Sequence, residues 1–276
     1  MHLRFSKMHG LGNDFMVVDL VTQHLELDPD MIKGWADRRT GIGFDQLLVV
    51  DPPSTPDADF GYRIYNADGT RAEQCGNGAR CFAKFVNDNG LSIKQALTLE
   101  TTTGLITTTL REDGNFEVAM GVPTAEHDHI PFVGNGPGLT QTLAVDGRAI
   151  DLTPVSVGNP HAVIWVDNVA AAPVTTLGPV LEQHPAFPNR VNVDFCQIVD
   201  RGFVRVRVWE RGAGETRACG TGACASVVAG RLQGLLDERV KVSLPGGKIR
   251  VAWPGPGTAV TLAGPACLVY QGELAL

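Results

Sequence analysis

The sequence predicts a sheet-dominated α/β (α+β) protein that consists of two homologous halves. Short apolar strand patterns separated by turn residues cover most of the 276 residues. Helical patterns are few and short. A glycine-rich cysteine motif occurs twice, 144 residues apart, which is about half of the chain. The length itself fits one large domain or two modest ones.

Composition limits the classes of protein to which the chain can belong. Hydrophobic residues make up 43% and charged residues 19%, which excludes a largely disordered chain. The net charge of -7 argues against nucleic acid or an anionic membrane as the main partner. The chain has no run of 18 apolar residues, and residues 1–15 lack the apolar core of a signal peptide. We therefore expect a cytoplasmic protein.

The first half begins with two strands around a glycine loop at residues 10–13. Asp28 as N-cap, with Pro29 at the first helical position, predicts a helix. Apolar runs and alternating patterns predict the remaining strands. The expected strands are 4–8, 15–20, 46–50, 62–65, 97–100, 104–110 and 116–120, with a turn at 112–115, and the expected helices are 29–39 and 77–90.

The second half repeats this texture and closes with a meander that turns at Pro245-Gly246-Gly247. The expected strands are 155–157, 162–166, 193–199, 204–210, 240–244, 249–253 and 259–262, and the expected helices are 168–183 and 221–235. A glycine-rich surface loop at 134–138 lies near the expected domain change. We expect one domain over 1–120, a second over 121–263, and a tail, 264–276, that returns to the first.

Three features recur at nearly one spacing. Cys75-Gly76-Asn77-Gly78-Ala79 and Cys219-Gly220-Thr221-Gly222-Ala223 share the pattern Cys-Gly-x-Gly-Ala. Each motif follows a strand that ends in a polar residue, Asn66 or Glu210, again 144 residues apart. Gly-Asn pairs, ending at Asn13 and Asn159, precede apolar strands 146 residues apart. Such agreement predicts an internal duplication.

Both cysteines are expected at or just before the N-terminus of a helix. Unpaired backbone N–H groups there favour an anion and lower the pKa of a thiol from about 8.5. Either thiol alone could simply be a buried helix cap. The duplication favours a different role, because two equivalent thiols could face one another across a domain cleft and exchange protons with one carbon. That is the arrangement of a two-base racemase or epimerase.

Polar side chains gather at the junctions of loops and strands. An amide there either contacts a ligand or completes a turn. Glu210 and Arg211 could pair with an amino group and a carboxylate of a substrate, or only with each other. His161 could hold or release a thiol proton, or it could bond only to backbone. The amides concerned are Asn13, Gln46, Asn66, Asn77, Asn159 and Asn192.

The other four cysteines are expected to be packing residues. Cys81 and Cys224 lie inside the predicted helices, at spacings from Cys75 and Cys219 that structural zinc sites do not favour. Cys196 and Cys267 lie in strand patterns. Six cysteines are too few for a disulfide framework. We expect no metal site.

The motifs resemble those of the diaminopimelate epimerase family over essentially the whole chain. The matching segments are Gly10-Leu11-Gly12-Asn13-Asp14-Phe15, Asn66-Ala67-Asp68-Gly69, Glu73-Gln74-Cys75-Gly76-Asn77-Gly78-Ala79-Arg80-Cys81, Gly158-Asn159-Pro160-His161, Glu210-Arg211-Gly212-Ala213-Gly214-Glu215-Thr216 and Cys219-Gly220-Thr221-Gly222. The resemblance implies cofactor-independent interconversion of LL- and meso-2,6-diaminopimelate, in lysine and peptidoglycan precursor synthesis. It also implies two pseudo-symmetric domains, each a mixed sheet curled around a central helix, with the active site in the cleft between them.

The resemblance also implies a role for each matching residue. Cys75 and Cys219 match the acid/base pair, and His161 and Glu210 match positions that tune the thiol pKa. Tyr270 matches a position associated with dimerisation, since the family commonly forms homodimers. The residues that match substrate-binding positions are Asn13, Gln46, Asn66, Gly76, Asn77, Asn159, Asn192, Glu210, Arg211, Gly220 and Thr221.

Three other functions stay open on the residues alone. A related racemase could act on proline or hydroxyproline, although such a substrate has no second amino acid head for Glu210 and Arg211 to bind. A redox or zinc-binding protein could use the cysteine motifs. A catalytically silent binding module is the third, which the presence of both thiols disfavours. No lysine lies in a recognisable pyridoxal context, so we expect no cofactor.

Overall fold

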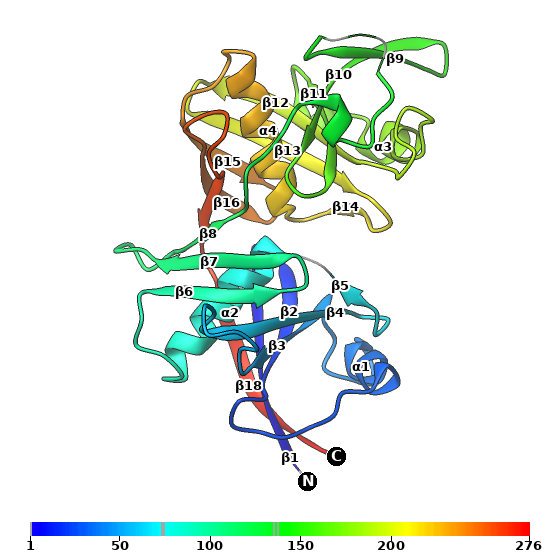
Figure 1. Ribbon diagram of the computed structural model, residues 1–276. Helices are drawn as coiled ribbons and strands as arrows, with labels where there is room; N and C mark the ends of the chain where they lie inside the picture. Colours follow the sequence, from blue (N-terminus) through cyan, green and yellow to red (C-terminus); the bar gives the residue numbers. More distant parts are fainter. Residues whose placement is uncertain (1, 73–74, 135, 137) are drawn as a thin grey trace. The chain divides into compact units, whose positions relative to one another are not determined.

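A computed structural model describes residues 2–72, 75–134, 136 and 138–276 (Figure 1). Glu73 and Gln74 of the first motif, and Asn135 and Pro137 of the 134–138 loop, lie outside the described residues. The chain divides into two compact units. The first unit extends to Ala119 and includes Ala263–Leu276, and the second is Met120–Leu262.

The first unit is a mixed sheet with two helices. Along the sheet, β18, β1 and β2 are antiparallel, β2 and β3 parallel, β3 and β4 antiparallel, β4 and β6 parallel, and β6, β7 and β8 antiparallel. The short β5 pairs with β4. The elements are β1 (His2–Gly10), β2 (Asn13–Asp19), α1 (Pro29–Ala36), β3 (Gln46–Asp51), β4 (Phe60–Asn66), β5 (Arg71–Ala72), α2 (Gly76–Asp88), β6 (Ala96–Thr101), β7 (Gly104–Leu110), β8 (Phe116–Ala119) and β18 (Cys267–Ala275).

The second unit is also a mixed sheet. Here β9, β10 and β11 are antiparallel, β11 and β12 parallel, β12 and β13 antiparallel, β13 and β15 parallel, and β15 and β16 antiparallel, while β14 pairs with β13. The elements are η1 (His127–His129), β9 (Gln141–Val145), β10 (Arg148–Ser156), β11 (Pro160–Trp165), η2 (Val169–Ala171), α3 (Val174–Glu182), β12 (Asn192–Asp200), β13 (Phe203–Glu210), β14 (Gly214–Thr216), α4 (Gly220–Leu232), β15 (Arg239–Leu244) and β16 (Gly247–Ala252). Strand β17 (Thr261–Gly264) includes the last two residues of this unit and the first two residues of the segment that returns to the first unit.

The two units share one topology. From β1 to β7 and from β10 to β16, the order of antiparallel and parallel pairings is the same, and the helices occur at the same places in the chain. The register agrees as well. Phe15 lies opposite Gln46 in the first parallel pair, and His161 lies opposite Asn192 in the second. The predicted duplication and the predicted fold class are confirmed.

Each sheet curls around one buried helix. Helix α4 contacts β10, β11, β12, β13, β15 and β16, and α2 contacts β1, β2, β3, β7 and β8 (Figure 1). Strands can approach α4 from many sides because Gly220–Leu232 is rich in Gly, Ala and other small residues that are buried. The residues that begin α2 and α4 are therefore held in place by the core of each unit.

The boundaries of some elements differ from the prediction. Asp28 caps α1 as expected, and Pro29 is its first residue, but α1 ends at Ala36. The helix expected at 168–183 is broken into η2 and α3 at Ala172 and Pro173, because the residue before a proline avoids helical backbone angles.

The hairpin of β9 and β10 was not anticipated, whereas Cys267 was expected in a strand and lies at the start of β18. The β9–β10 hairpin turns at Asp146-Gly147, where both residues have positive φ (49° and 73°). Aspartate followed by glycine is a common hairpin signal, so the sequence did contain this information. Strand β18 pairs along the length of β1. Among the described residues, no helix has both the length and the apolar character that a membrane span needs.

Candidate active site

The first cysteine motif forms the N-cap of α2. Cys75 has extended backbone angles (φ -146°, ψ 106°), and its sulfur accepts a hydrogen bond from Gly78 N at 3.3 Å. A side chain at position 78 would meet Tyr62 Oη at 2.4 Å, so only glycine fits there. Tyr62 Oη in turn donates to the carbonyl of Cys75 at 3.2 Å. Packing therefore fixes the position of the cysteine at the helix end, as the sequence predicted.

Two predicted binding residues lie beside this thiol. Asn13, the first residue of β2, accepts through Oδ1 from Cys75 Sγ at 3.7 Å and from Asn77 Nδ2 at 3.3 Å. The buried Arg80 donates to Asn77 Oδ1 at 2.9 Å and orients this amide. Asn13 Nδ2 donates to Asp45 Oδ2 at 2.9 Å. The structure thus brings Asn13, Cys75 and Asn77 together.

Gln46 and Asn66 form a second polar pair in the first unit. They lie opposite one another on β3 and β4, and Gln46 Nε2 donates to Asn66 Oδ1 at 3.1 Å. Asn66 also serves the turn that follows it: its carbonyl accepts from Gly69 N at 2.9 Å, and its Nδ2 donates to Thr70 Oγ1 at 3.1 Å. Part of this amide's hydrogen-bonding capacity is therefore used locally.

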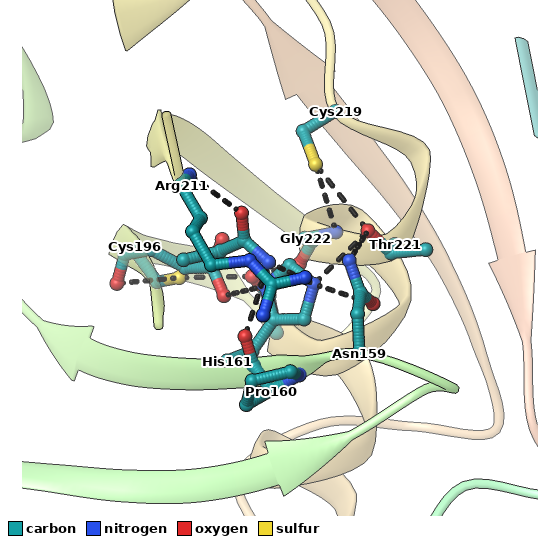
Figure 2. A network of polar contacts seen from close by, with 11 residues as sticks. Asn159, Pro160, His161, Cys196, Arg211, Cys219, Thr221 and Gly222 are labelled. Atoms are coloured by element: carbon teal, nitrogen blue, oxygen red, sulfur yellow. Dashed lines mark hydrogen bonds and ion pairs between the residues drawn. The ribbon is translucent and has the colours of Figure 1, made fainter. Parts of the chain in front are cut away.

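The second motif repeats the geometry of the first. Cys219 is the N-cap of α4, with φ -111° and ψ 113°, and its sulfur accepts from Gly222 N at 3.4 Å (Figure 2). The Thr221 hydroxyl lies 3.4 Å from the same sulfur. A side chain at position 222 would meet Asp194 Oδ1 at 2.5 Å, so glycine is required here as well. This cysteine is also at the predicted helix end.

His161 lies at the centre of a network of side chains and does not simply bond to backbone (Figure 2). It is fully buried. Its Nδ1 lies 2.8 Å from Asp194 Oδ2, and its Nε2 lies 3.0 Å from Thr221 Oγ1 and 3.2 Å from Asn159 Oδ1. Asp194 was missed by the sequence analysis. The signal for it was a single carboxylate inside the apolar run that forms the buried strand β12.

Glu210 and Arg211 do not pair with each other among the described residues. The Thr216 hydroxyl donates to Glu210 Oε1. The exposed Arg211 donates from its guanidinium to the carbonyl of Asn189 at 2.9 Å and from its backbone N–H to Asn192 Oδ1 at 2.9 Å. Asn192 is buried, and its Nδ2 donates to the carbonyl of Pro160 at 3.0 Å. Asn192 thus connects the start of β12 to the end of β13.

The expectation of a lowered thiol pKa is wrong for Cys219. Burial raises the pKa of this thiol well above its usual range, and the carboxylates of Glu210 and Asp194 raise it further. Hydrogen bonds from Thr221 and Gly222 lower the pKa, but these contributions are smaller. Burial also raises the pKa of Glu210, although hydrogen bonds with Thr216 and Cys219 oppose this. Cys219 is therefore a protonated thiol at neutral pH.

The start of α4 offers hydrogen-bond donors to an anion. The first N–H groups of a helix have no partner within the helix. At α4, the N–H of Gly222 bonds to the Cys219 sulfur and that of Ala223 to the Cys219 carbonyl. Among the described residues, nothing accepts from the N–H groups of Gly220 and Thr221. Gly76 and Asn77 occupy the same two positions of α2.

Of the remaining predicted residues, Cys196 contacts the network around His161, because its sulfur lies 3.6 Å from the carbonyl oxygen of Asp194 (Figure 2). Cys81, Cys196 and Cys224 are buried in the core, as expected. Cys267, expected to pack in the core, is only partly buried at the start of β18. Tyr270 is also on β18, where its exposed ring makes an edge contact with Phe5.

Solved structures that match the chain over nearly its whole length include an epimerase, a racemase and a phenazine biosynthesis protein. A hydroxyproline epimerase from Agrobacterium vitis matches with a TM-score of 0.74 and 17% identity, covering 100% of this chain and 93% of that one. A probable proline racemase from Agrobacterium radiobacter K84 matches with a TM-score of 0.72 and 19% identity, covering 99% and 93%. These matches show that the chain shares its fold with proteins described as an epimerase and a racemase, and in this chain a cysteine caps the buried helix of each unit.

Sequence comparison then identifies the family. The family model for diaminopimelate epimerase matches residues 5–126 and 153–269. A diaminopimelate epimerase of Azotobacter vinelandii (strain DJ / ATCC BAA-1303) is 58% identical, and one of Pseudomonas aeruginosa (strain LESB58) is 54% identical, both over 100% of each chain. The chain belongs to the diaminopimelate epimerase family.

Proposed function

We propose that this protein interconverts LL- and meso-2,6-diaminopimelate by acid/base catalysis with two cysteines and without a cofactor. The observation that carries the proposal is the cysteine at the same position of both units, the N-cap of a buried helix. Two thiols at equivalent positions suit a reaction whose forward and reverse directions are nearly mirror images. The relatives named for this substrate are 54% and 58% identical over their whole length.

In the proposed reaction, one thiolate removes the proton from an α-carbon. The electron pair of the C–H bond moves toward the α-carboxylate, and the thiol of the other cysteine delivers a proton to the opposite face of the carbon. Cys75 and Cys219 exchange these roles when the direction reverses. Burial raises the pKa of the Cys219 thiol, which favours this residue as the proton donor of the resting enzyme.

The first residues of α2 and α4 would hold the α-carboxylate. The N–H groups of Gly76, Asn77, Gly220 and Thr221 lie in the first turn, where the helix dipole favours negative charge. Charge grows on this carboxylate as the proton leaves, so donors that are already in place stabilise the transition state more than the ground state.

The remaining amides would bind the rest of the substrate. Asn13, Gln46 and Asn66 in the first unit and Asn192 in the second lie at strand ends, and Asn159 directly precedes β11, so all five supply donors and acceptors at defined positions. Glu210 and Arg211 have opposite charges and would bind the amino and carboxylate groups of the distal amino acid head. This selects a substrate with two such heads over proline.

We also infer that the protein is a cytoplasmic homodimer. Strand β18 presents three neighbouring exposed apolar residues, Leu268, Val269 and Tyr270, which supports an interface with a second copy. The net charge of -7 supports the absence of a nucleic acid partner.

A panel of substrates tests the proposal. The purified protein is offered LL-diaminopimelate, L-proline, trans-4-hydroxy-L-proline and L-lysine, and chiral chromatography follows the configuration of each. We expect conversion of LL- to meso-diaminopimelate alone. Turnover of proline or hydroxyproline without turnover of diaminopimelate would replace this proposal with the related racemase activity.

A further inference from the structure

The surroundings of the two cysteines differ at one pair of equivalent positions. His161 and Asp194 in the second unit correspond in register to Phe15 and Leu48 in the first, each 146 residues earlier in the chain. Phe15 and Leu48 are fully buried apolar residues. The fold is therefore built around an apolar pair in one unit and an ionisable pair in the other.

A buried ionisable pair is costly when an apolar pair can fill the same place. His161 and Asp194 are both fully buried, and Asp194 Oδ1 has no hydrogen-bond partner among the described residues. Replacing such a pair by apolar residues is often neutral or stabilising. The first unit has the buried apolar residues Phe15 and Leu48 at these two positions. The requirements of the fold do not explain the pair, which points to a role in the reaction.

A continuous set of polar contacts joins this pair to one catalytic thiol (Figure 2). The Cys219 sulfur lies 3.4 Å from Thr221 Oγ1, which lies 3.0 Å from His161 Nε2. Nδ1 of the same ring lies 2.8 Å from Asp194 Oδ2. The other neighbours of Nε2 suit both of its protonation states: Asn192 Nδ2, at 3.4 Å, can donate to the bare nitrogen, and Asn159 Oδ1, at 3.2 Å, can accept from N–H.

We propose that the Thr221 hydroxyl relays the Cys219 proton to His161, and that Asp194 is the positioning residue that makes His161 able to accept it. Asp194 accepts from Nδ1–H and so directs the lone pair of Nε2 at Thr221. The Cys219 S–H bond breaks and its electron pair stays on sulfur, while Thr221 takes this proton and passes its own to Nε2. The imidazolium that forms is stabilised by the Asp194 carboxylate.

This inference deepens the proposed function and rests on it for its catalytic meaning. It explains how Cys219 can become a thiolate although burial raises its pKa, as the direction that starts on this residue requires. The titratable groups that face the thiol within its unit are His161 on β11, Asp194 on β12 and Glu210 on β13. The charged residues of the other strands around α4 are exposed: Arg148, Asp151, Arg239, Lys241, Lys248 and Arg250.

The test uses two opposite effects that Asp194 could have on the reactivity of the Cys219 thiol. As a bare negative charge, Asp194 raises the pKa of Cys219, so Asp194→Asn would make the thiol more reactive. As the partner of His161, it stabilises the imidazolium that accompanies the thiolate, so the same substitution would make the thiol less reactive. Alkylation of Cys219 by iodoacetamide, followed by mass spectrometry of its peptide across pH 6–10 without substrate, separates the two.

We expect Asp194→Asn to slow alkylation of Cys219 about tenfold at pH 7, the equivalent of one unit in apparent pKa. Thr221→Val should slow it similarly, and Thr221→Ser, which retains the hydroxyl, should recover most of the rate. Asp200→Asn is the matched control, because it makes the same exchange at an exposed position of the same strand, β12. Faster or unchanged alkylation in Asp194→Asn overturns the relay.

A double variant and a kinetic measurement also test the relay. The double variant His161→Phe with Asp194→Leu places the first unit's residues in the second, and we expect it to fold but to lose the reactivity of Cys219 at pH 7. Unaltered Cys219 reactivity in it contradicts the relay even if Asp194→Asn does not fold. With diaminopimelate, kcat of Asp194→Asn should fall about tenfold while KM changes less than twofold. If no variant or parent turns over this substrate, the proposed function fails, but the alkylation result still decides the relay.

Discussion

Cys75 and Cys219 each combine two roles, since each thiol is a helix cap and the proposed acid or base. Their sulfur atoms accept from Gly78 N and Gly222 N, so each thiol is held at a fixed point of the helix end. A serine hydroxyl can make the same capping bond, and serine is a preferred N-cap residue. Its pKa, however, is far too high for a base near neutral pH.

Cys75→Ser and Cys219→Ser are therefore expected to keep the fold and lose the activity. Turnover of diaminopimelate should fall at least about 1,000-fold in each, because each variant lacks one of the two proton-transfer groups. Circular dichroism and thermal melting should match the parent. Epimerisation at close to the parent rate by either variant would refute the assignment of that cysteine.

Glu210 has an effect on Cys219 that is opposite to the one we infer for Asp194. Its carboxylate raises the pKa of the Cys219 thiol by charge repulsion with the thiolate. Glu210→Gln removes the charge and retains an oxygen that accepts from Thr216. The pKa of Cys219 should fall, and alkylation of Cys219 at pH 8 should become about threefold faster or more. A slower reaction would mean that Glu210 acts as the base that deprotonates the thiol.

Helices α2 and α4 show how glycine makes this arrangement possible. Gly222 lies in the first turn of α4 against Asp194, and Gly34 lies at an exposed position of α1, where a Cβ would meet nothing within 4 Å. The two glycines can be compared directly by substitution with alanine. Both lie in helices, but only at Gly222 would the new Cβ contact a neighbouring residue.

Gly222→Ala is expected to lower the free energy of unfolding by about 2–3 kcal/mol, because the new Cβ would lie 2.5 Å from Asp194 Oδ1 and the two groups must move apart. Gly34→Ala should raise it by about 0.5–1 kcal/mol, because alanine has the better helix propensity. Chemical denaturation measures both. A neutral Gly222→Ala would show that α4 and β12 can separate at no cost.

The sequence predicted elements better than it predicted contacts between them. The duplicated motif located both cysteines at helix ends, because local glycine and capping patterns determine that placement. The break at Pro173 and the Asp146-Gly147 hairpin were missed, although each has a local signal. The pairing of His161 with Asp194 could not be predicted, because it depends on the register of β11 and β12, two strands separated by α3.

At the scale of the whole molecule, duplication followed by divergence describes the chain. Both units keep the same pairing order and the same capped helix, and the polar positions correspond: Asn13 with Asn159, Gln46 with Asn192 and Asn66 with Glu210. Other equivalent positions differ in chemistry, since the apolar Phe15 corresponds to the ionisable His161. The shared topology thus places a cysteine at the start of the buried helix in both units. Substitutions near these cysteines make the two thiols chemically distinct.

The inferred homodimer makes a prediction at this scale. Tyr270→Asp places a charge on the exposed apolar stretch of β18 and should shift the protein from dimer to monomer at micromolar concentration in sedimentation experiments. Lys241→Glu, an exposed change on β15 in the other unit, is the control and should leave the mass unchanged. A parent protein that sediments as a monomer would remove the inference.

The reaction in deuterated water tests the central claim, that two different groups remove and deliver the proton, most directly. LL-diaminopimelate is incubated with the protein, and the isotope content of both isomers is followed at early times. Two thiols predict one deuterium at a single α-carbon of the meso product, with almost none in the remaining LL substrate. Deuterium entering the LL substrate as fast as the product would mean that one group does both, and the two-cysteine account would be wrong.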